Sequence, residues 1–418
     1  MKFQGMHMLQ SGVAQLARRR LFVSFMGLMV FAAARTPAWS AGTSDIIWLE
    51  SNSTAGNSIL AFKNDGTAPP TFLGSTPAGG IGVFDDTFAL GPFDSDQNLI
   101  TNPEGTLLFA VNSGSNSIAV FRITATGLEP VDGSPFPSGG SDPVSLGLKG
   151  DVLTVVNKDQ DPAQNVDLVQ PNYTTLHVFP DGLLVPIPHS TVPVAYGSSP
   201  SQALVASQGD FVFGADFLGG LLQSFRLDQH GRLRQNLPQA LPDSVFIGQT
   251  AGHQPLGMRT HPSLPILYVD ITGLSEVAVY RYDGNGIPSF VRTVSDSGKA
   301  PCWAIVNHAG TRLYTTNTGD NSIEVYDLTD PFNPVDIQHF VMASTTGAVF
   351  STVIDNSDGW IYVSNEQSSA SATTAANAFH TLQVNSDGTL TEPFAPTVLP
   401  IGGTVPVRAQ GITVVGAN

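Results

Sequence analysis

The chain has 418 residues, with 18 Lys and Arg against 34 Asp and Glu, and its formal net charge is −16 at pH 7. A surface this acidic repels the phosphates of nucleic acids and of anionic membranes, so neither is expected as a partner. Cys302 is the single cysteine, which excludes an internal disulfide and leaves stability to the hydrophobic core.

The N-terminal segment has the pattern of an export signal. Arg18, Arg19 and Arg20 precede an apolar run over residues 21–34, and small residues follow at 38–41, where a signal peptidase cuts. The run has 14 residues, fewer than the roughly 20 that span a bilayer. We predict a signal peptide over residues 1–41 and a mature domain over 42–418, with no membrane span.

Removal of the signal takes away five basic residues and no acidic ones, so the mature chain would carry a net charge of −21. Arg19-Arg20 also fits the twin-arginine pattern, which leaves both export routes open. The mature protein is expected in the periplasm or outside the cell.

The mature chain has the pattern of an all-β protein. Short segments rich in β-branched and aromatic residues alternate with Gly, Pro, Asn and Asp, and helical periodicity is almost absent. In chain order, the predicted hairpins pair residues 46–51 with 58–62, 107–112 with 117–122, 152–157 with 173–179, 211–216 with 221–227, 266–270 with 277–282, 312–317 with 322–326, and 360–365 with 379–384.

One phrase recurs along the chain. Residues 108–121 and 313–326 share the pattern Asn-x-Gly-x-Asn-Ser-Ile-x-Val followed by Phe or Tyr. Asn112 and Asn365 end the first strands of two hairpins and lie 253 residues apart, which gives about 51 residues for each of five steps. Hairpin repeats of this length are typical of a β-propeller. We predict seven blades of four strands each.

A short apolar strand after a Pro or polar turn precedes most hairpins and is predicted to be the innermost strand of its blade. These strands cover residues 96–102, 142–146, 199–204, 254–258, 300–305 and 350–354. The first hairpin has none before it, but residues 408–415 fit the pattern. We predict that this C-terminal strand completes the blade begun by residues 46–75, because an open ring would leave strand edges exposed.

The recurring phrases, the stretch over residues 300–317 and the Asp-Gly-x-Leu turns resemble the seven-bladed lactonase-type propellers. That family includes 6-phosphogluconolactonases and carboxymuconate-lactonizing enzymes, and it is related to surface propellers with Tyr-Val-Thr-Asn repeats. The resemblance covers essentially the whole mature chain and implies the propeller fold and lactone chemistry. The matched residues themselves are structural: Gly supplies positive φ, and the Asn at the strand end is expected to cap its turn by bonding its own backbone.

Propellers bind ligands at a mouth of the central channel, and we place the functional mouth where the loops lead into the innermost strands. His253 is the candidate general base, because imidazole titrates near neutral pH. Asp96 or Asp142 would orient it. The alternative is a loop histidine without a role.

Two arginines could hold the carboxylate of a small oxygen-rich ligand. Arg259 stands where other blades carry Leu204 and Ile305, so its charge needs a ligand or a neighbouring acid. Arg408 could add a second bidentate contact or remain a solvated charge. Gln202 and Gln410 complete the predicted substrate-binding set.

No metal and no cofactor is expected. Residues 94–98 and 157–161 have the oxygen spacing of calcium loops, but the Gly at the sixth position and the Glu at the twelfth are missing. The sequence contains no Gly-x-Ser-x-Gly elbow, no His-Glu-x-x-His and no Gly-rich phosphate loop. Cys302, beside Trp303 in an apolar strand, is predicted to pack in the core.

Two functions stay open. The first is an exported lactonase-like enzyme that opens or forms the lactone of a small sugar acid or aromatic acid, with His253 moving the proton and Arg259 and Arg408 holding the carboxylate. The second is a non-catalytic propeller that binds a protein partner or a glycan at the cell envelope. In either case we expect a monomer.

Overall fold

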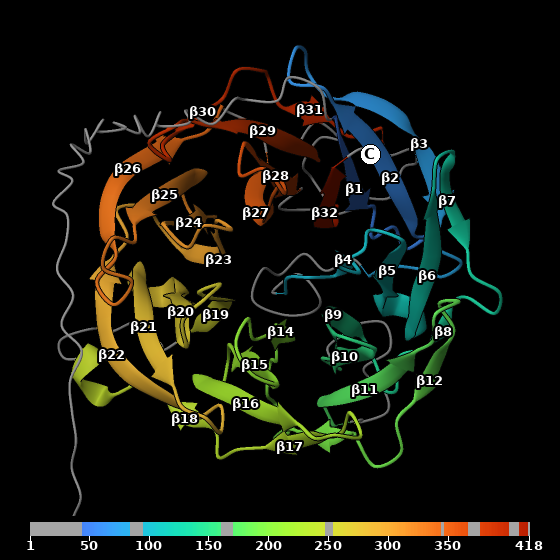
Figure 1. Cartoon of the computed structure of the whole chain (residues 1–418), viewed down its shortest axis with the longest axis horizontal. Coiled ribbons are helices and arrows are strands. Elements are labelled where there is room, and N and C mark those ends of the chain that lie inside the picture. Colours follow the sequence, from blue (N-terminus) through green and yellow to red (C-terminus); the bar gives the residue numbers. More distant parts are fainter. Residues whose placement is uncertain are drawn as a thin grey trace, which may run out of the picture. The chain divides into compact units, whose positions relative to one another are not determined.

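Seven antiparallel sheets follow one another in a ring around a central axis (Figure 1). The computed structural model describes residues 44–83, 95–159, 170–246, 254–343, 347–366, 377–400 and 409–416. Each sheet has a path of four strands, and four of the sheets carry one additional short strand. The predicted all-β propeller with seven four-stranded blades is confirmed.

The first four blades contain the following strands, in order from the innermost to the outermost. Blade 1 contains β32 (Gln410–Gly416), β1 (Asp45–Glu50), β2 (Ser58–Asn64) and β3 (Thr71–Pro77). Blade 2 contains β4 (Leu99–Thr101), β5 (Leu107–Asn112), β6 (Ser117–Thr124) and β7 (Gly127–Pro130), with β8 (Phe136–Pro137) beside β6. Blade 3 contains β9 (Pro143–Lys149), β10 (Val152–Asn157), β11 (Asn172–Val178) and β12 (Leu184–Pro186), with β13 (Val192–Pro193) beside β11. Blade 4 contains β14 (Leu204–Val205), β15 (Phe211–Asp216), β16 (Leu221–Leu227) and β17 (Leu233–Gln235), with β18 (Gln239–Ala240) beside β16.

The remaining three blades follow the same order. Blade 5 contains β19 (Pro255–Thr260), β20 (Ile266–Ile271), β21 (Glu276–Tyr282) and β22 (Pro288–Ser295). Blade 6 contains β23 (Pro301–Val306), β24 (Arg312–Asn317), β25 (Ser322–Asp327) and β26 (Val335–Val341). Blade 7 contains β27 (Ala348–Ile354), β28 (Trp360–Glu366), β29 (Ala378–Val384) and β30 (Leu390–Thr391), with β31 (Thr397–Val398) beside β29. Within the described ranges, short 3-10 helices cover Ser113–Ser115, Asp243–Phe246 and Thr272–Leu274.

The ring is closed by the C-terminal strand, as predicted. β32 pairs antiparallel with β1 from Asp45 opposite Gly416 to Glu50 opposite Gln410, with a bulge between Leu49 and Glu50. The two ends of the ring are thereby joined in one sheet, and β1 has a partner on each side. Closure removes the free edge that β1 would otherwise present.

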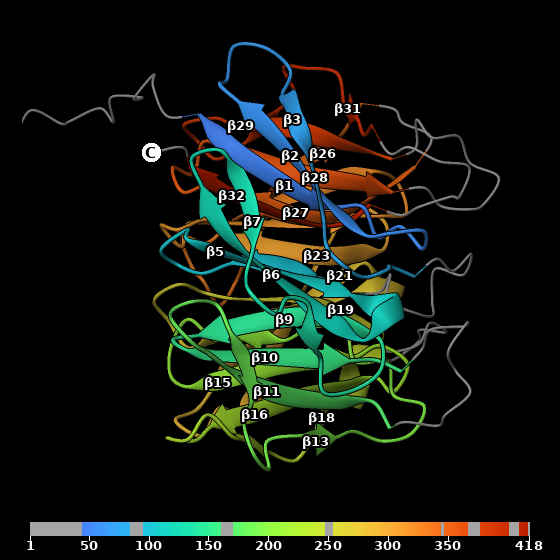
Figure 2. The same ribbon diagram turned by 90° about the vertical axis from the view of Figure 1, so that its right-hand side faces the viewer.

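The core lies between neighbouring sheets, and Figure 2 shows from the side how blades 2, 3 and 4 follow one another. β5, β15 and β20 are buried along their whole length, because both of their faces are covered. Alternate side chains of such a strand face opposite neighbours: Phe109 packs with Leu153 of blade 3, whereas Leu108 packs with Trp48 of blade 1. The outermost strands β3 and β26 are exposed or half-buried at every position.

The asparagines at the strand ends form bonds other than the predicted ones. Instead of bonding its own turn backbone, Asn112 donates through Nδ2 to the Ala78 carbonyl (3.1 Å), and Asn157 donates to the Ser138 carbonyl (3.4 Å). Both carbonyls belong to the segment that arrives from the preceding outer strand. A Cβ on Gly80 would lie 2.6 Å from Asn112 Cγ, so the glycine is needed for close approach. Asn112 and Asn157 thus tie the hairpins of blades 2 and 3 to the segments that lead into these blades.

The predicted signal peptide over residues 1–41 lies outside the described residues. Within the described ranges, the structure contains no helix that is both long and apolar enough to span a bilayer.

Candidate functional site

A short segment before β4 contacts the innermost strands of several blades. Residues 95–98 lead into β4 and lie between inner strands of other blades (Figure 1). The Leu146 N–H of blade 3 donates to the Gln97 carbonyl (2.9 Å), and Asn98 Nδ2 donates to the Val144 carbonyl (2.7 Å). The Asp96 N–H donates to the Ser201 carbonyl of blade 4 (3.4 Å). We call residues 95–98 the plug.

The backbone of the plug is held in an uncommon conformation. Gln97 has a φ of 63°, the left-handed region, which costs a residue with a Cβ roughly 1–2 kcal/mol. Gln202 offsets this cost, because its Nε2 donates to Gln97 Oε1 (2.8 Å) while its Oε1 accepts the Met258 N–H (2.9 Å). Gln202 is fully buried, so it links blades 2, 4 and 5 and fixes the position of Gln97.

The plug brings a carboxylate next to the one channel arginine among the described residues of the inner strands. Arg259, on β19, lies with Nη2 3.8 Å from Oδ2 of Asp96, and its Nε donates to the Ala304 carbonyl (3.0 Å). The sequence required either a ligand or a neighbouring acid for this charge, and the structure supplies the acid. The Arg259 side chain is still 26% exposed, whereas that of Asp96 is 7% exposed.

Burial shifts the ionisation of both partners. Loss of solvent raises the pKa of Asp96 above its ordinary value, and the Arg259 guanidinium opposes that rise by favouring the carboxylate. Burial likewise lowers the pKa of Arg259, opposed by the negative charges of Asp96 and Asp270. A carboxylate with a raised pKa is a better proton acceptor than a solvated one, which suits it to general-base chemistry.

The other predicted residues have different surroundings. Gln410 is buried and donates through Nε2 to the Ser95 carbonyl (3.3 Å), so it contacts the plug from blade 1. Asp142 is buried at the start of β9, where its N–H donates to Asn116 Oδ1 (2.8 Å) and its carbonyl accepts the Lys158 N–H (2.8 Å).

His253 and Arg408 lie outside the described residues, so their predicted roles stay predictions. The structure therefore brings together Asp96, Arg259, Gln202 and Gln410 around the plug.

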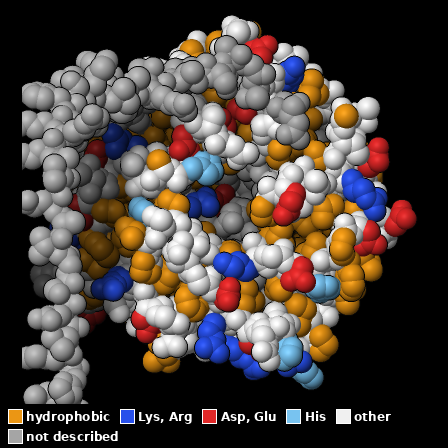
Figure 3. All heavy atoms as spheres, viewed as in Figure 1, with side chains coloured by type: hydrophobic (Ala, Val, Ile, Leu, Met, Phe, Trp, Pro, Cys, Tyr) orange, Lys and Arg blue, Asp and Glu red, His pale blue; other side chains and the backbone are white. Residues whose placement is uncertain are grey.

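A cavity of about 500 Å³ opens beside the plug. Its wall contains Gln97 and Arg259, the turn at residues 102–105 between β4 and β5, Asn356 in the turn after β27, and the end of β32. These turns follow the innermost strands along the chain. The predicted functional mouth was at the opposite end, where the loops precede these strands. Figure 3 shows one face of the ring hollowed at its centre, with acidic and basic side chains beside the hollow. We call this space the channel cavity.

Sequence reasoning missed the turn residues Asn102, Glu104 and Asn356 in the cavity wall. The signal was available, because Asn102 ends a predicted innermost strand and Glu104 and Asn356 lie two residues after one, so all three belong at a mouth of the channel. The choice between the two mouths was not predictable, because it depends on the plug. The plug is held by bonds between residues about 50 to 300 positions apart in the sequence.

Sequence reasoning also missed Asp270, a buried acid on β20. Neither of its carboxylate oxygens has a hydrogen-bond partner among the described residues. Its equivalent in blade 6, Thr316, donates from Oγ1 to the carbonyl of Phe350 in the next blade (2.9 Å). Burial raises the pKa of Asp270 well above its ordinary value, Asp296 adds to this, and Arg259 opposes it. A protonated Asp270 can donate as Thr316 does, whereas an ionised one cannot.

The arrangement offers two chemical capacities at one place. Arg259 uses Nε for the Ala304 carbonyl and Nη2 for Asp96, and Nη1 has no partner in the described part of the chain. A free guanidinium N–H can bind a carboxylate or a developing oxyanion. Asp96 beside it can take a proton from water.

Comparison with known proteins agrees with the fold. A family described as lactonase, 7-bladed beta-propeller, matches residues 187–406, which are 220 of the 418 residues. No curated protein matches the chain.

Solved structures resemble the chain over most of its length. A Bacteroides uniformis protein named provisionally as a 6-phosphogluconolactonase aligns with 13% identity and a TM-score of 0.65, covering 89% of this chain and 99% of its own. The periplasmic gluconolactonase of Pseudomonas aeruginosa aligns with 15% identity and a TM-score of 0.63, covering 90% of this chain and 100% of its own. A hypothetical selenium-binding protein of Sulfolobus tokodaii aligns with 11% identity and a TM-score of 0.62, covering 90% and 94%. At these identities the likeness shows the shared fold alone.

Proposed function

The chain belongs to the lactonase family of seven-bladed β-propellers, and on this premise we propose that it hydrolyses the lactone of a small sugar acid in the channel cavity. The observation that carries the proposal is that Arg259 lines the cavity, with Nη1 unpaired among the described residues, while its buried partner Asp96 lies 3.8 Å from Nη2. A base and a cationic donor at one place are what lactone opening requires.

The proposed reaction uses both side chains in the same step. A water attacks the lactone carbonyl carbon and gives its proton to the Asp96 carboxylate, while the Arg259 guanidinium stabilises the negative charge that develops on the carbonyl oxygen. The bond from that carbon to the ring oxygen then breaks. The ring oxygen leaves as a hydroxyl after taking the proton from Asp96, so the product is the open hydroxy acid and both residues are restored.

The cavity wall favours a sugar-acid lactone over an aromatic one. The turn residues Asn102, Glu104 and Asn356 offer hydrogen-bonding side chains to hydroxyl groups, and no aromatic residue lines the described part of the cavity. Glu104 also disfavours a phosphorylated substrate, because its charge would repel the phosphate. A neutral aldonolactone is therefore the substrate class that we propose.

The proposed location is the periplasm or the cell exterior. The pattern over residues 1–41 supports export. The periplasmic gluconolactonase that shares the fold is consistent with the same compartment. An exported enzyme would meet unphosphorylated lactones.

The test is the hydrolysis of a panel of five- and six-membered aldonolactones and aromatic-acid lactones, followed by proton release. We expect Arg259→Gln to lower kcat/KM by about 100- to 1,000-fold, as is typical for loss of one oxyanion donor. The matched control is Arg281→Gln, an exposed arginine in the same blade, which should leave kcat/KM unchanged. His253→Ala compared with Asp96→Asn identifies which of the two candidates is the base.

Two results would count against the proposal. Turnover that survives Arg259→Gln removes the channel cavity as the site. The absence of turnover on every lactone favours the alternative of a non-catalytic binding propeller.

A further inference from the structure

The junction between blades 3 and 4 lacks an aromatic residue that fills the equivalent place elsewhere. In blades 5 and 6 the third residue of the second strand is a tyrosine, whose hydroxyl donates to a carbonyl of the next blade: Tyr268 to Pro331 (2.8 Å) and Tyr314 to Gly388 (3.0 Å). In blade 3 this residue is Thr154, which is too short to reach across. The outer part of that junction is left unfilled.

A second threonine takes over the lost hydrogen bond. Thr175 on β11 donates from Oγ1 to the Gly231 carbonyl (2.7 Å), and Gly231 holds the same place in its turn as Gly388. Gly231 has a φ of +72°, and a Cβ there would lie 2.7 Å from Ile187 Cδ1 and 2.8 Å from Val152 Cγ2. This bond joins the two blades in the interior of the junction, and the space between the bond and the protein surface stays open.

That space is a groove of about 710 Å³, within the range of about 300–1,000 Å³ usual for small-molecule sites. Two bonds across the blades hold its walls. Lys149 Nζ donates to the Gly209 carbonyl (2.9 Å), and Arg232 Nε donates to the Pro188 carbonyl (3.0 Å). Both bonds cross from one blade to the other beside the groove.

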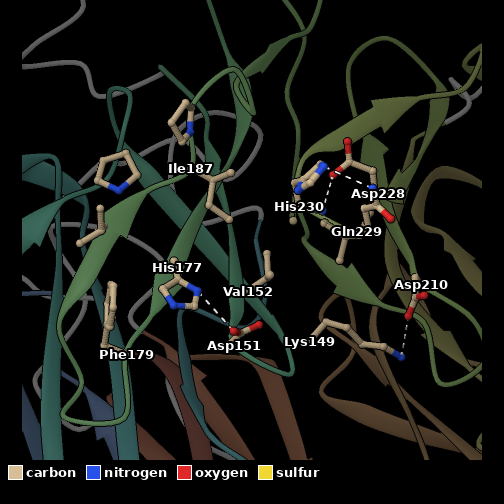
Figure 4. A pocket seen from close by; sticks show the side chains of 15 residues that line it. Lys149, Asp151, Val152, His177, Phe179, Ile187, Asp210, Asp228, Gln229 and His230 are labelled. Atoms are coloured by element: carbon tan, nitrogen blue, oxygen red, sulfur yellow. Dashed lines mark hydrogen bonds and ion pairs between the residues drawn. The ribbon is translucent and has the colours of Figure 1, made fainter.

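The groove combines apolar and polar walls (Figure 4). Val152 and Ile187 lie between His177 on one side and Gln229 on the other. The Phe179 ring, 38% exposed, stands edge-on to the His177 ring with centroids 4.4 Å apart. An apolar surface flanked by hydrogen-bonding side chains matches a sugar ring, which has C–H faces and a rim of hydroxyls.

Two of the three acids in the groove form ion pairs: Asp210 with Lys149 (3.9 Å) and Asp228 with Arg234 (3.1 Å). The third, Asp151, lies 3.4 Å from His177, which balances its charge only when the imidazole is protonated. A site built for an anion would carry an excess of positive charge. The groove has no such excess, so its donors and acceptors suit a neutral ligand better than an acidic one.

We propose that the groove between blades 3 and 4 binds a neutral oligosaccharide. This site is separate from the channel cavity and does not depend on the proposed lactonase activity. The unfilled junction supplies the space, Val152, Ile187 and Phe179 supply the apolar surface, and the paired charged side chains with Gln229 supply hydrogen bonds to hydroxyls.

The test is saturation-transfer NMR and calorimetric titration of the whole protein with cellotriose, maltotriose and chitotriose, and with trigalacturonic acid as the charged counterpart. We expect at least one neutral trisaccharide to bind, and to bind at least about fivefold more tightly than the acid. Phe179→Ala and Gln229→Ala, both at exposed side chains, should each weaken binding by about fivefold or more. Phe72→Ala is the matched control, because Phe72 is exposed to a similar degree (43%) and lies on blade 1.

The lactonase variant Arg259→Gln should bind the sugar as the wild type does, so failure of one site is distinguishable from failure of the other. The groove proposal is overturned if no neutral trisaccharide binds at 10 mM, if trigalacturonic acid binds equally well, or if Phe179→Ala and Gln229→Ala leave the affinity unchanged.

Discussion

Two junctions of the ring are built from the same repeat but differ in their outer part. The junction between blades 6 and 7 is filled there, whereas the junction between blades 3 and 4 is open. Between blades 6 and 7, the Tyr314 hydroxyl bonds the Gly388 carbonyl (3.0 Å), and Arg312 Nη2 bonds the Asp387 carbonyl (2.7 Å). Between blades 3 and 4, Thr154 stands in the place of Tyr314, and a groove of about 710 Å³ remains. Two side chains of the second strand thus distinguish the filled junction from the open one: Arg312 and Tyr314 in blade 6 are replaced by Val152 and Thr154 in blade 3.

The same comparison explains why such a change is tolerated. The deeper contact between blades 3 and 4 is kept by Thr175, which bonds Gly231, and by the buried cluster that includes Tyr173 and Phe225, with ring centroids 4.5 Å apart. These inner contacts hold blades 3 and 4 together without the tyrosine that fills the outer part of the junction between blades 6 and 7.

The largest loss of stability should come from removal of the strand that closes the ring. Deletion of residues 410–418 removes β32, which seals blade 1, and with it the buried Ile412 and Val414. These two side chains contribute roughly 1.5–3 kcal/mol each, and β1 gains a free edge. Total stability is usually about 5–15 kcal/mol, so we expect loss of the cooperative thermal transition by circular dichroism. A truncated chain that melts at the wild-type temperature would contradict the closure of the ring.

A smaller loss of stability should follow when the filled junction between blades 6 and 7 receives the residue of the open one. Tyr314→Thr places the residue of blade 3 in blade 6, and it removes a buried ring together with the donor to Gly388. We expect the free energy of unfolding in urea to fall by about 3–5 kcal/mol, as for other deletions of a buried aromatic ring. Tyr196→Thr is the matched control, because Tyr196 is 70% exposed, and it should change stability by less than about 0.5 kcal/mol. A loss below about 1 kcal/mol for Tyr314→Thr would mean that the tyrosine does not seal the junction.

The repeat made most of the fold predictable. Each blade repeats one pattern of apolar strands and turns, so the number of blades and the pairing of β32 with β1 follow from counting. The open junction could also have been predicted, because an alignment of the hairpin repeats is enough to place Thr154 at the position of Tyr314.

The site was less predictable because its residues meet only in three dimensions. Asp96 and Asp142 have the same sequence context, each just before an innermost strand. The structure places Asp96 beside Arg259, whereas the backbone of Asp142 bonds Asn116 and Lys158. The difference arises from the left-handed Gln97 and its bond to Gln202, a contact across 105 residues that no local pattern encodes.

The smallest predicted effect concerns the third tyrosine of the series, at the junction between blades 7 and 1. Tyr362 donates to the Asp45 carboxylate (2.5 Å) instead of a carbonyl, and burial raises the pKa of Asp45 to about 6, against an ordinary 3.8. The folded protein therefore holds this proton more tightly than the unfolded chain does, so its contribution to stability is present below about pH 4 and is lost as the pH rises through about 6. Asp45→Asn keeps an acceptor for Tyr362 but cannot titrate. We expect urea unfolding at pH 4 and at pH 6.5 to show a smaller loss of stability for Asp45→Asn than for the wild type, and equal losses would mean that this junction does not respond to pH.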